Sequence, residues 1–514
     1  MSIRTVPKTR FPIKAFGNDN NKKTMTPLIF KKSISLPPPS DNDRRAHDQR
    51  IKDTLGLGPI DIPLTVLKRF PFFLNTGAPF SCIIGRINRE YKLLDVGTER
   101  SYSIALDLGT TNLVALLYDN IAQKDVLTKS GENPQIIFGS DIMTRMHHTM
   151  SGNGEEVYRV LANGINGLIV DLCRDARVNT QDIHAMTVAG NTVMTHFFLG
   201  LDISTIPVEP FTPVVRTPGS FSASELNIAI SPEAIVYVFP NAGSYVGGDI
   251  TAGILASGIA RTDKTSILID VGTNAEIVIG NRDWMIVGAG AAGPALEEGI
   301  SRIGKRANKG IVYDVEIRGG DISCKTFDQA KPEGICGSGM VSLLYELFTS
   351  GMIDKSGALV DGEHVTVIDG EKTLSIVCDG SEALFITQNE IQSFMRSKAA
   401  MFTLLLVLTR SVGISFKDIE TVFVSGALGT GINAEKAAGI GMLPQWPAVI
   451  VKPLGNSSLE GARMLLMDSG LVNTVNAVVE KITYKPMQDD PEFMKEYMGA
   501  VFIPHTNPEM LKVG

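Results

Sequence analysis

The sequence predicts an α/β protein made of two related halves, each a sheet flanked by helices. A hairpin-like stretch occurs twice, as SIALDLGTTNLVAL at 103–116 and as SILIDVGTNAEIVI at 266–279, and strand-like apolar runs alternate with helical spacing after each copy. This alternation predicts a mostly parallel sheet covered on both faces, in two copies. The chain of 514 residues is also too long for a single core.

The region before the first copy is expected to lie outside the repeat. Residues 1–36 carry eight lysines and arginines against Asp19 alone, so residues 1–40 are predicted to be a flexible basic arm that ends in the proline spacer Pro37–Pro39. A docking arm for an acidic partner is the alternative. Residues 41–100 are expected to form a small middle domain, with a charged helix first and a strand at 82–87 later.

The first half is expected to span residues 101–265. After the hairpin, apolar residues recur at helical spacing over 155–177, and AMTVA at 185–189 has the pattern of a buried strand. That strand ends at Gly190-Asn191. The end of a strand in an α/β sheet is where a functional side chain is expected, so Asn191 is predicted to face the cleft.

The second half is expected to span residues 266–485, followed by a tail at 486–514. GICGSG at 334–339 opens an apolar helix, a long helix is predicted around 390–412, and TVFVSG at 421–426 is a strand followed by a glycine-rich turn and another helix. The two halves therefore share one plan of hairpin, helix and strand.

Composition excludes several classes of protein. Hydrophobic residues make up 44% and charged residues 20%, as in a soluble globular protein, and a net charge of −7 favours neither nucleic acid nor anionic lipid. No apolar run approaches the ~20 residues of a membrane span and no secretory signal is present, which predicts a cytoplasmic protein. The spacing of the five cysteines predicts no disulfide framework and no zinc or iron-sulfur motif; they are Cys82, Cys173, Cys324, Cys336 and Cys378.

The repeated turn has the chemistry of a phosphate site. Its glycine lets the backbone bend so that consecutive N–H groups and a threonine hydroxyl can hold phosphate oxygens, and a carboxylate beside phosphate needs a cation such as Mg²⁺. One copy alone would equally suit an ordinary hairpin. Two copies, each leading a separate half, favour a triphosphate held from both sides.

Three stretches carry a resemblance to a superfamily. ALDLGTTN at 105–112 and LIDVGTNAEI at 268–277 resemble the two phosphate motifs of the actin, sugar-kinase and heat-shock-chaperone ATPases, and VFVSGALGTGINAE at 422–435 resembles their adenosine turn. GICGSG resembles the start of a connecting helix. The resemblance implies a two-lobed actin-like (ribonuclease H-like) ATPase fold that binds ATP and Mg²⁺.

A narrower resemblance covers residues 101–480. Eight stretches, in order, are similar to the ATP-dependent reductive activators of corrinoid proteins: ENPQIIFGSDIMTR, TVAGNTVMTHFFLGLD, VEPFTP, NAGSYVGGDITAGIL, GAAGPALEEGI, GICGSGMVSLLYEL, ITQNEIQSFMRSKAA and PLGNSSLEGAR. Members of that family use ATP to return Co(II) in a corrinoid protein to Co(I), with electrons from a fused iron-sulfur domain. The scattered cysteines provide no cluster in this chain, so a separate ferredoxin-like protein is the expected donor.

The resemblance and the charge pattern together nominate site residues. Asp107 and Asp270 are expected to organise Mg²⁺ through its waters, and Asp249 is the candidate catalytic group or, equally, a helix N-cap. Glu276 and Glu297 are further candidates for the water shell of the metal. The expected nucleotide-binding residues are Gly109, Thr110, Thr111, Asn112, Asn191, Gly272, Thr273, Asn274, Gly337, Ser338, Gly426 and Gly429.

Other residues and functions stay open at this point. His147-His148 is not expected to bind metal because adjacent side chains diverge, His196 is expected in a core or interface with an axial cobalt ligand as the alternative, and Cys336 is expected to pack. The expected partner is a corrinoid protein, with a homodimer left open. A nucleotide-gated chaperone-like module without a redox role and a small-molecule kinase are the alternative functions.

Overall fold

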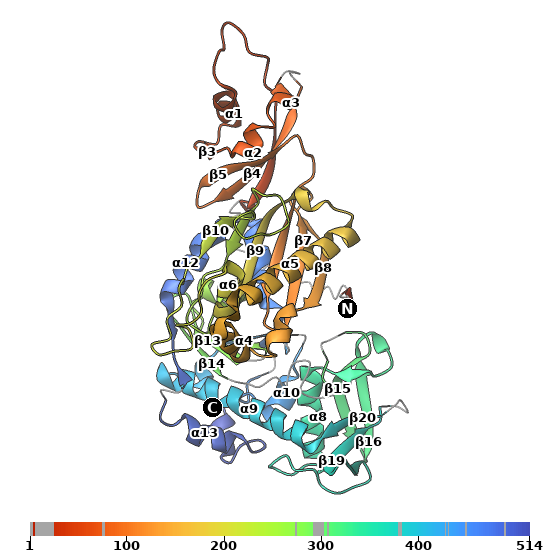
Figure 1. Ribbon diagram of the computed structural model, residues 1–514. Helices are drawn as coiled ribbons and strands as arrows, with labels where there is room; N and C mark the ends of the chain where they lie inside the picture. The colour runs from red at the N-terminus through yellow and green to blue at the C-terminus, as the bar shows by residue number, and fades with distance from the viewer. Residues whose placement is uncertain are drawn as a thin grey trace. The chain divides into compact units, whose positions relative to one another are not determined.

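The computed structural model describes residues 4–5, 25–74, 78–272, 275–290, 303–305, 308–378, 383–426, 428–429, 431–447, 450–487 and 490–513 (Figure 1). The chain divides into two compact units. The first consists of Met1–Ala256 and Ser458–Glu480, and the second of Ser257–Ser457 and Lys481–Gly514. Each unit contains one copy of the repeated hairpin.

A seven-stranded sheet organises the first unit. Its spatial order is β1 (Arg4–Thr5), β8 (Lys124–Glu132), β7 (Asn112–Asp119), β6 (Tyr102–Leu108), β9 (Ile183–Gly190), β11 (Ile235–Val238) and β10 (Gly219–Ser222). Strands β6, β9 and β11 run parallel, whereas the other pairings are antiparallel. The expectation of a mostly parallel sheet is wrong here, because strands joined by a tight turn pair antiparallel.

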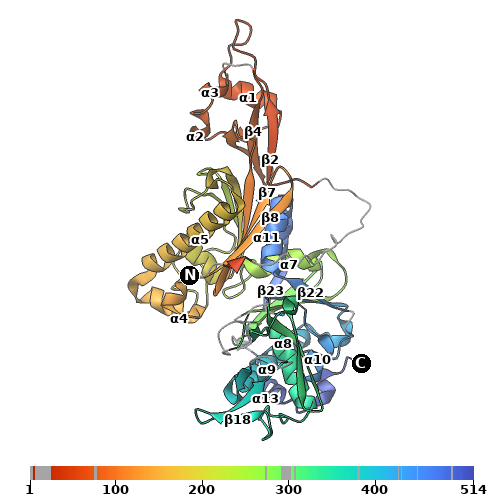
Figure 2. The same ribbon diagram turned by 90° about the vertical axis from the view of Figure 1, so that its right-hand side faces the viewer.

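Helices cover both faces of this sheet. Ile104, Leu106 and Leu108 of β6 pack in the same core as α5 (Gly154–Ala176) and α6 (Thr192–Leu199), while Ala105 joins the opposite core with α7 (Gly248–Ser257), α11 (Ser457–Met467) and α12 (Leu471–Lys481). Figure 2 shows α5 and α11 on opposite sides of β7 and β8. This arrangement follows from the alternation of side chains along a strand. The predicted hairpin, helix and strand are confirmed.

Residues 458–480 lie in a different unit from the expected one. The expected boundaries assign them to the second half, yet Leu459, Leu465 and Val475 pack on the sheet of the first unit. The backbone N–H of Leu28 also donates to Leu466 O at 3.0 Å. Burial of the apolar faces of α11 and α12 against the sheet explains the difference, since sequence order does not decide which sheet a helix covers.

A four-stranded sheet forms the small accessory domain. Its order is β2 (Ile29–Ile34), β4 (Phe80–Ile87), β5 (Glu90–Val96) and β3 (Ile60–Asp61), with α1 (His47–Leu55), α2 (Leu64–Leu67) and α3 (Pro71–Leu74) beside it. Strand β2 falls inside the predicted flexible arm, so that boundary is wrong. Buried Ile29 and Ile34 anchor the strand, although the adjacent Lys31 and Lys32 between them gave the segment the composition of a basic arm.

A six-stranded sheet organises the second unit. Its order is β22 (Val451–Gly455), β21 (Thr421–Gly426), β12 (Ser266–Val271), β13 (Ala275–Gly280), β14 (Met285–Gly290) and β23 (Ile482–Tyr484). Helices α8 (Gly337–Thr349), α9 (Gln388–Ser411), α10 (Ala434–Gly439) and α13 (Phe493–Ala500) belong to the same unit. The predicted hairpin, the two helices and the strand at 421–426 are confirmed.

Two three-stranded sheets complete the second unit. One has the order β16 (Asp321–Thr326), β15 (Ile311–Arg318), β17 (Gly334–Ile335), and the other β18 (Val365–Ile368), β19 (Glu371–Ile376), β20 (Leu384–Thr387). A disulfide joins Cys324 to Cys378, so the expectation that the cysteines form no disulfide is wrong for this pair: the fold brings together two residues that are 54 positions apart. The other cysteines are free and buried, and burial raises the pKa of Cys82 to about 12 and that of Cys173 to about 11.

Helix α9 is the one described helix with the length and apolar character of a membrane span. Its 18-residue window is 78% buried within the protein. Phe394, Phe402 and Leu405 lie in the core of the second unit. This helix is therefore the core helix of a soluble domain.

Candidate functional site

The turn between β6 and β7 is the first candidate phosphate site. Three consecutive carbonyls of this turn accept hydrogen bonds from the segment 133–145. Asn133 donates from Nδ2 to Gly109 O at 2.9 Å and from its backbone N to Thr111 O at 2.8 Å. Arg145 Nη1 donates to Thr110 O at 2.7 Å. In a planar trans peptide the N–H points opposite to the C=O. The N–H groups of Thr110 and Thr111 therefore point away from that segment, to one common side.

Two glycines allow this close packing. A Cβ on Gly109 would come within 2.4 Å of Asn112 O, and one on Gly247 would come within 2.3 Å of Asn191 Cα. Asn191 caps α6 by accepting from Met194 N at 2.9 Å, and its Nδ2 donates to Thr110 Oγ1 at 3.0 Å. The strand ends of β6 and β9 and the loop before α7 thus meet at one place in the first unit, which includes Asn191.

The aspartates of the first unit lie at this edge of the sheet. Asp107 is half-buried near the end of β6, and Ser458 Oγ donates to its Oδ1 at 2.8 Å. Asp249 is half-buried in the first turn of α7, where its Oδ1 accepts from Ile250 N at 2.8 Å. A carboxylate in the first turn also interacts favourably with the helix dipole. Asp249 therefore stabilises the helix start, and this role is compatible with a catalytic one.

The second candidate phosphate site surrounds Asp270 at the end of β12. Its Oδ2 accepts from Ser425 Oγ at 3.1 Å and from Ser457 Oγ at 3.4 Å. Gly426 adopts a φ of +70°, and a Cβ there would lie 2.2 Å from Val271 O. Glycine is required at this position because an L side chain would be strained and would clash with the strand beside Asp270.

Only some of the remaining predicted residues of the second unit lie within the described part of the chain. Gly272 is half-buried next to β12, whereas Thr273, Asn274 and Glu297 lie outside the described residues. Glu276 pairs directly across from Asp270 in the β12–β13 ladder, so the two side chains share a face of the sheet. Gly429 packs against β22, since its carbonyl accepts from Gly455 N at 2.9 Å.

Gly337 and Ser338 begin α8 and are buried. Cys336 Sγ and Ser338 Oγ are 3.1 Å apart, so Cys336 packs as expected of a small interior residue. On the same helix, Ser342 and Glu346 follow Ser338 at intervals of four and therefore lie on one face. That face contacts a charged side chain that the sequence analysis did not single out.

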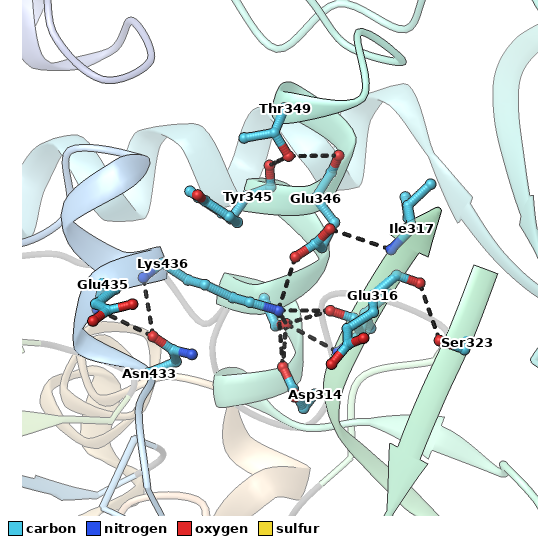
Figure 3. A network of polar contacts seen from close by, with 12 residues as sticks. Asp314, Glu316, Ile317, Ser323, Tyr345, Glu346, Thr349, Asn433, Glu435 and Lys436 are labelled. Atoms are coloured by element: carbon cyan, nitrogen blue, oxygen red, sulfur yellow. Dashed lines mark hydrogen bonds and ion pairs between the residues drawn. The ribbon is translucent and has the colours of Figure 1, made fainter. Parts of the chain in front are cut away.

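That side chain is Lys436, in α10 directly after the predicted adenosine turn (Figure 3). Its Nζ donates to Val315 O at 2.7 Å and to Ser342 Oγ at 2.7 Å, and it lies 3.0 Å from both Asp314 Oδ1 and Glu346 Oε1. Burial alone would raise the pKa of Asp314, but hydrogen bonds from Ser342, Lys325 and Lys436 lower it to about 2. One ammonium thus joins β15, α8 and α10.

The histidines do not form a metal site. His196 is fully buried, with Nδ1 at 2.7 Å from Thr192 O and Nε2 accepting from Val214 N at 3.1 Å, and burial lowers its pKa. Because both ring nitrogens are used, the axial-ligand alternative is wrong for this conformation. His148 stacks on Phe138 at 4.8 Å. Across the described residues, no three His, Cys, Asp or Glu side chains form a metal cluster.

The oxygen-rich surroundings of Asp107 and Asp270 fit Mg²⁺. Each half-buried carboxylate has serine hydroxyls beside it, and Mg²⁺ prefers such hard oxygen ligands, usually one or two carboxylates plus waters. Sequence reasoning did not identify Asn133, Arg145, Ser425 or the serine pair Ser457-Ser458. Asn133, Arg145 and the serine pair do lie in two of the stretches that carried the family resemblance, ENPQIIFGSDIMTR and PLGNSSLEGAR.

Comparison with known proteins gives consistent matches along the chain. The family described as the C-terminal domain of RACo, the ASKHA domain, matches residues 264–513, and the RACo middle region matches residues 102–262. Over 415 residues the chain is 31% identical to the corrinoid activation enzyme RamQ of Eubacterium limosum, covering 77% of this chain and 69% of RamQ.

Two further proteins are similar over most of their length. The [Co(II) methylated amine-specific corrinoid protein] reductase of Methanosarcina barkeri is 25% identical over 417 residues, which cover 74% of this chain and 73% of that protein. The solved structure of a reductive activator for corrinoid, iron-sulfur protein superposes with a TM-score of 0.90 at 32% identity, covering 95% of this chain and 81% of that one.

Proposed function

The chain belongs to the RACo family of ATP-dependent reductive activators of corrinoid proteins, and from this premise we propose that it hydrolyses ATP to help restore Co(I) in a corrinoid protein. The ASKHA domain implies ATP binding. The observation that carries the proposal within this chain is the serine pair. Ser457 and Ser458 are consecutive residues, and each hydroxyl bonds the aspartate of its own unit, Asp270 and Asp107.

The two candidate phosphate turns act on one nucleotide in this proposal. The N–H groups of Thr110 and Thr111 hold phosphate oxygens from the first unit, and Gly272, Thr273 and Asn274 hold them from the second. Asp107 and Asp270 hold Mg²⁺ through its waters, and the ion neutralises charge that develops on the phosphates. The serine hydroxyls support this arrangement because they orient both carboxylates.

Hydrolysis requires a group that positions the attacking water. Asp249 is the proposed group, since it lies in the first turn of α7, two residues after Gly247, which packs on Asn191, and Asn191 in turn donates to Thr110. Gly426 and Gly429 let the backbone approach adenosine, and Asn112, Gly337 and Ser338 line the same nucleotide. Most of the rate in such a site comes from placement and charge stabilisation.

In this proposal, ATP turnover changes the conformation of the activator and thereby its affinity for the docked corrinoid protein. If ATP and the corrinoid protein each favour the same conformation of the activator, each tightens the binding of the other by the same factor. We propose a separate ferredoxin-like protein as the electron donor. The proposed setting is the cytoplasm, with no nucleic-acid or membrane partner, and a homodimer is compatible with it.

The test uses the full chain with a Co(II) corrinoid protein. We expect ATP hydrolysis to rise when that protein is added, and the Co(I) absorbance to appear only when a low-potential electron donor is also present. The product is free phosphate, whereas a kinase would yield a phosphorylated small molecule. Absence of stimulation by every corrinoid protein encoded near this gene contradicts the proposal.

A further inference from the structure

Arg145 is a buried cation whose hydrogen bonds go to neutral groups. Its side chain is fully buried, and its Nε and Nη1 donate to two neutral carbonyls, Gly139 O at 2.8 Å and Thr110 O at 2.7 Å. Its Nη2 is buried and has no hydrogen-bond partner within the described residues. None of the ion pairs formed by the described residues includes it. A buried charge without an ion-pair partner is unfavourable, so a functional explanation for the burial of Arg145 is expected.

Asp141 attracts Arg145 through space but forms no ion pair with it among the described residues. Both carboxylate oxygens of Asp141 instead accept hydrogen bonds from Thr144, at 2.9 Å from its N and 2.7 Å from its Oγ1. Burial lowers the pKa of Arg145 to about 10, an effect that Asp141 partly offsets. The guanidinium therefore remains charged at neutral pH.

The hydrogen bond to Thr110 O places this charge directly behind the first phosphate turn. The carbonyl of Thr110 points toward Arg145, so the N–H of Thr111 points to the opposite side. Asn133 holds the neighbouring carbonyl of Gly109 in the same way. A positive charge thus lies on the carbonyl side of peptides whose N–H groups point away from it.

We infer that Arg145 is a positioning residue for the phosphate turn and that its buried charge is balanced by the phosphates of the bound nucleotide. The inference rests on the proposed function and deepens it, since it assigns a residue to the recognition of phosphate charge. The guanidinium acts across the Thr110 peptide: it holds the turn and favours an anion on the N–H side. Such a Coulombic effect grows with the charge of the phosphate chain and does not act on adenosine.

The test compares R145Q, which removes the charge and keeps an amide donor, with R145K, which keeps the charge. For R145Q we expect ATP affinity to fall on the order of 30-fold, as for a charge roughly 8 Å away at an effective dielectric constant of ~20, with a smaller fall for ADP. Adenosine affinity should not change. R145K should keep the ratio of ATP to adenosine affinity within about threefold of the original protein. Calorimetry with the three ligands gives these ratios.

The matched control is K129M. Lys129 is also a buried cation of the first unit, but it is paired with Asp175 at 2.6 Å. Its loss should lower stability while leaving the ATP to adenosine ratio unchanged. A purely structural role of Arg145 would lower ATP, ADP and adenosine affinity together in R145Q, and this result overturns the inference.

The other outcomes separate the inference from the proposed function. If the original protein binds ATP and R145Q binds it equally well, the inference alone is wrong. If the original protein binds no ATP, the proposed function fails as well. Should R145Q not fold, R145K decides: a tenfold or greater fall in its ATP to adenosine ratio overturns the inference, and a ratio within about threefold supports it.

Discussion

Each unit buries a cation beside a predicted nucleotide segment. One of these cations is paired with carboxylates, and the other forms no ion pair within the described residues. Lys436 in the second unit has Asp314 and Glu346 within 3.0 Å, whereas Arg145 in the first unit bonds only carbonyl oxygens among the described residues. The Lys436 network is closed, so its function is to hold α10 against α8 and β15. The charge of Arg145 is not neutralised by an ion pair, and a site that binds an anion requires such a charge.

The largest expected effect is on the stability of the second unit. K436M leaves half-buried Glu346 without its cation and Asp314 with the exposed Lys325 alone, and we expect the free energy of unfolding to fall by about 3–5 kcal/mol. R145Q should change it by about 1 kcal/mol or less without nucleotide, since no carboxylate is left unpaired. Urea denaturation of both variants measures the difference.

The control for K436M is K325M. Lys325 also contacts Asp314, at 2.9 Å, but its side chain is 55% exposed. We expect its loss to cost about 1 kcal/mol or less. Equal losses for K436M and R145Q would remove the contrast between a closed and an open charge site.

The next effect concerns the two aspartates. Asp107→Asn and Asp270→Asn each remove one negative charge beside the proposed Mg²⁺, and we expect kcat for ATP hydrolysis to fall on the order of 10²–10³-fold in either variant. Steady-state phosphate release measures this. If one of the two variants retains full turnover, the two turns do not serve one nucleotide equally.

The pH dependence of stability tests the Lys436 network. Because the folded protein lowers the pKa of Asp314 to about 2 from 3.8, the stabilisation is fully present above about pH 4 and is lost as the pH falls toward 2. The expected loss is about 2 kcal/mol. Denaturation at pH 5 and pH 3 should show a smaller difference for D314N than for the original protein. Identical pH profiles would mean that Asp314 is not held ionised by its partners.

The smallest expected effect is a difference in Mg²⁺-ATP binding between variants of the serines that orient the aspartates. S458A removes a hydrogen bond of 2.8 Å to Asp107, whereas S425A removes a longer one, of 3.1 Å, to Asp270, which keeps Ser457 as a donor. We expect S458A to weaken Mg²⁺-ATP binding by about 1 kcal/mol and S425A by less. Titration of Mg²⁺ at fixed ATP gives both values, and a larger effect for S425A would reverse the assigned roles.

Local sequence patterns were sufficient to predict the family and the ATPase fold. The strands of the repeated hairpin, the helix over 155–177 and the strand at 421–426 depend on residues close in sequence, and each forms as predicted. Asn191 lies at the end of the predicted strand at 185–189, and its contact with Thr110 was not predicted. The resemblance to reductive activators rests on the same short stretches.

Tertiary structure decided what depends on residues far apart in the chain. Ser458 reaches Asp107 across 351 positions, and Lys436 reaches Asp314 across 122. Helices α11 and α12 cover the first sheet because they bury apolar faces there, and no local pattern records which sheet a helix will cover. The sequence by itself determined the turns and their chemistry. Packing alone decided which charges are neutralised and that Arg145 lies behind the first turn, because burial and pairing are properties of the assembled fold.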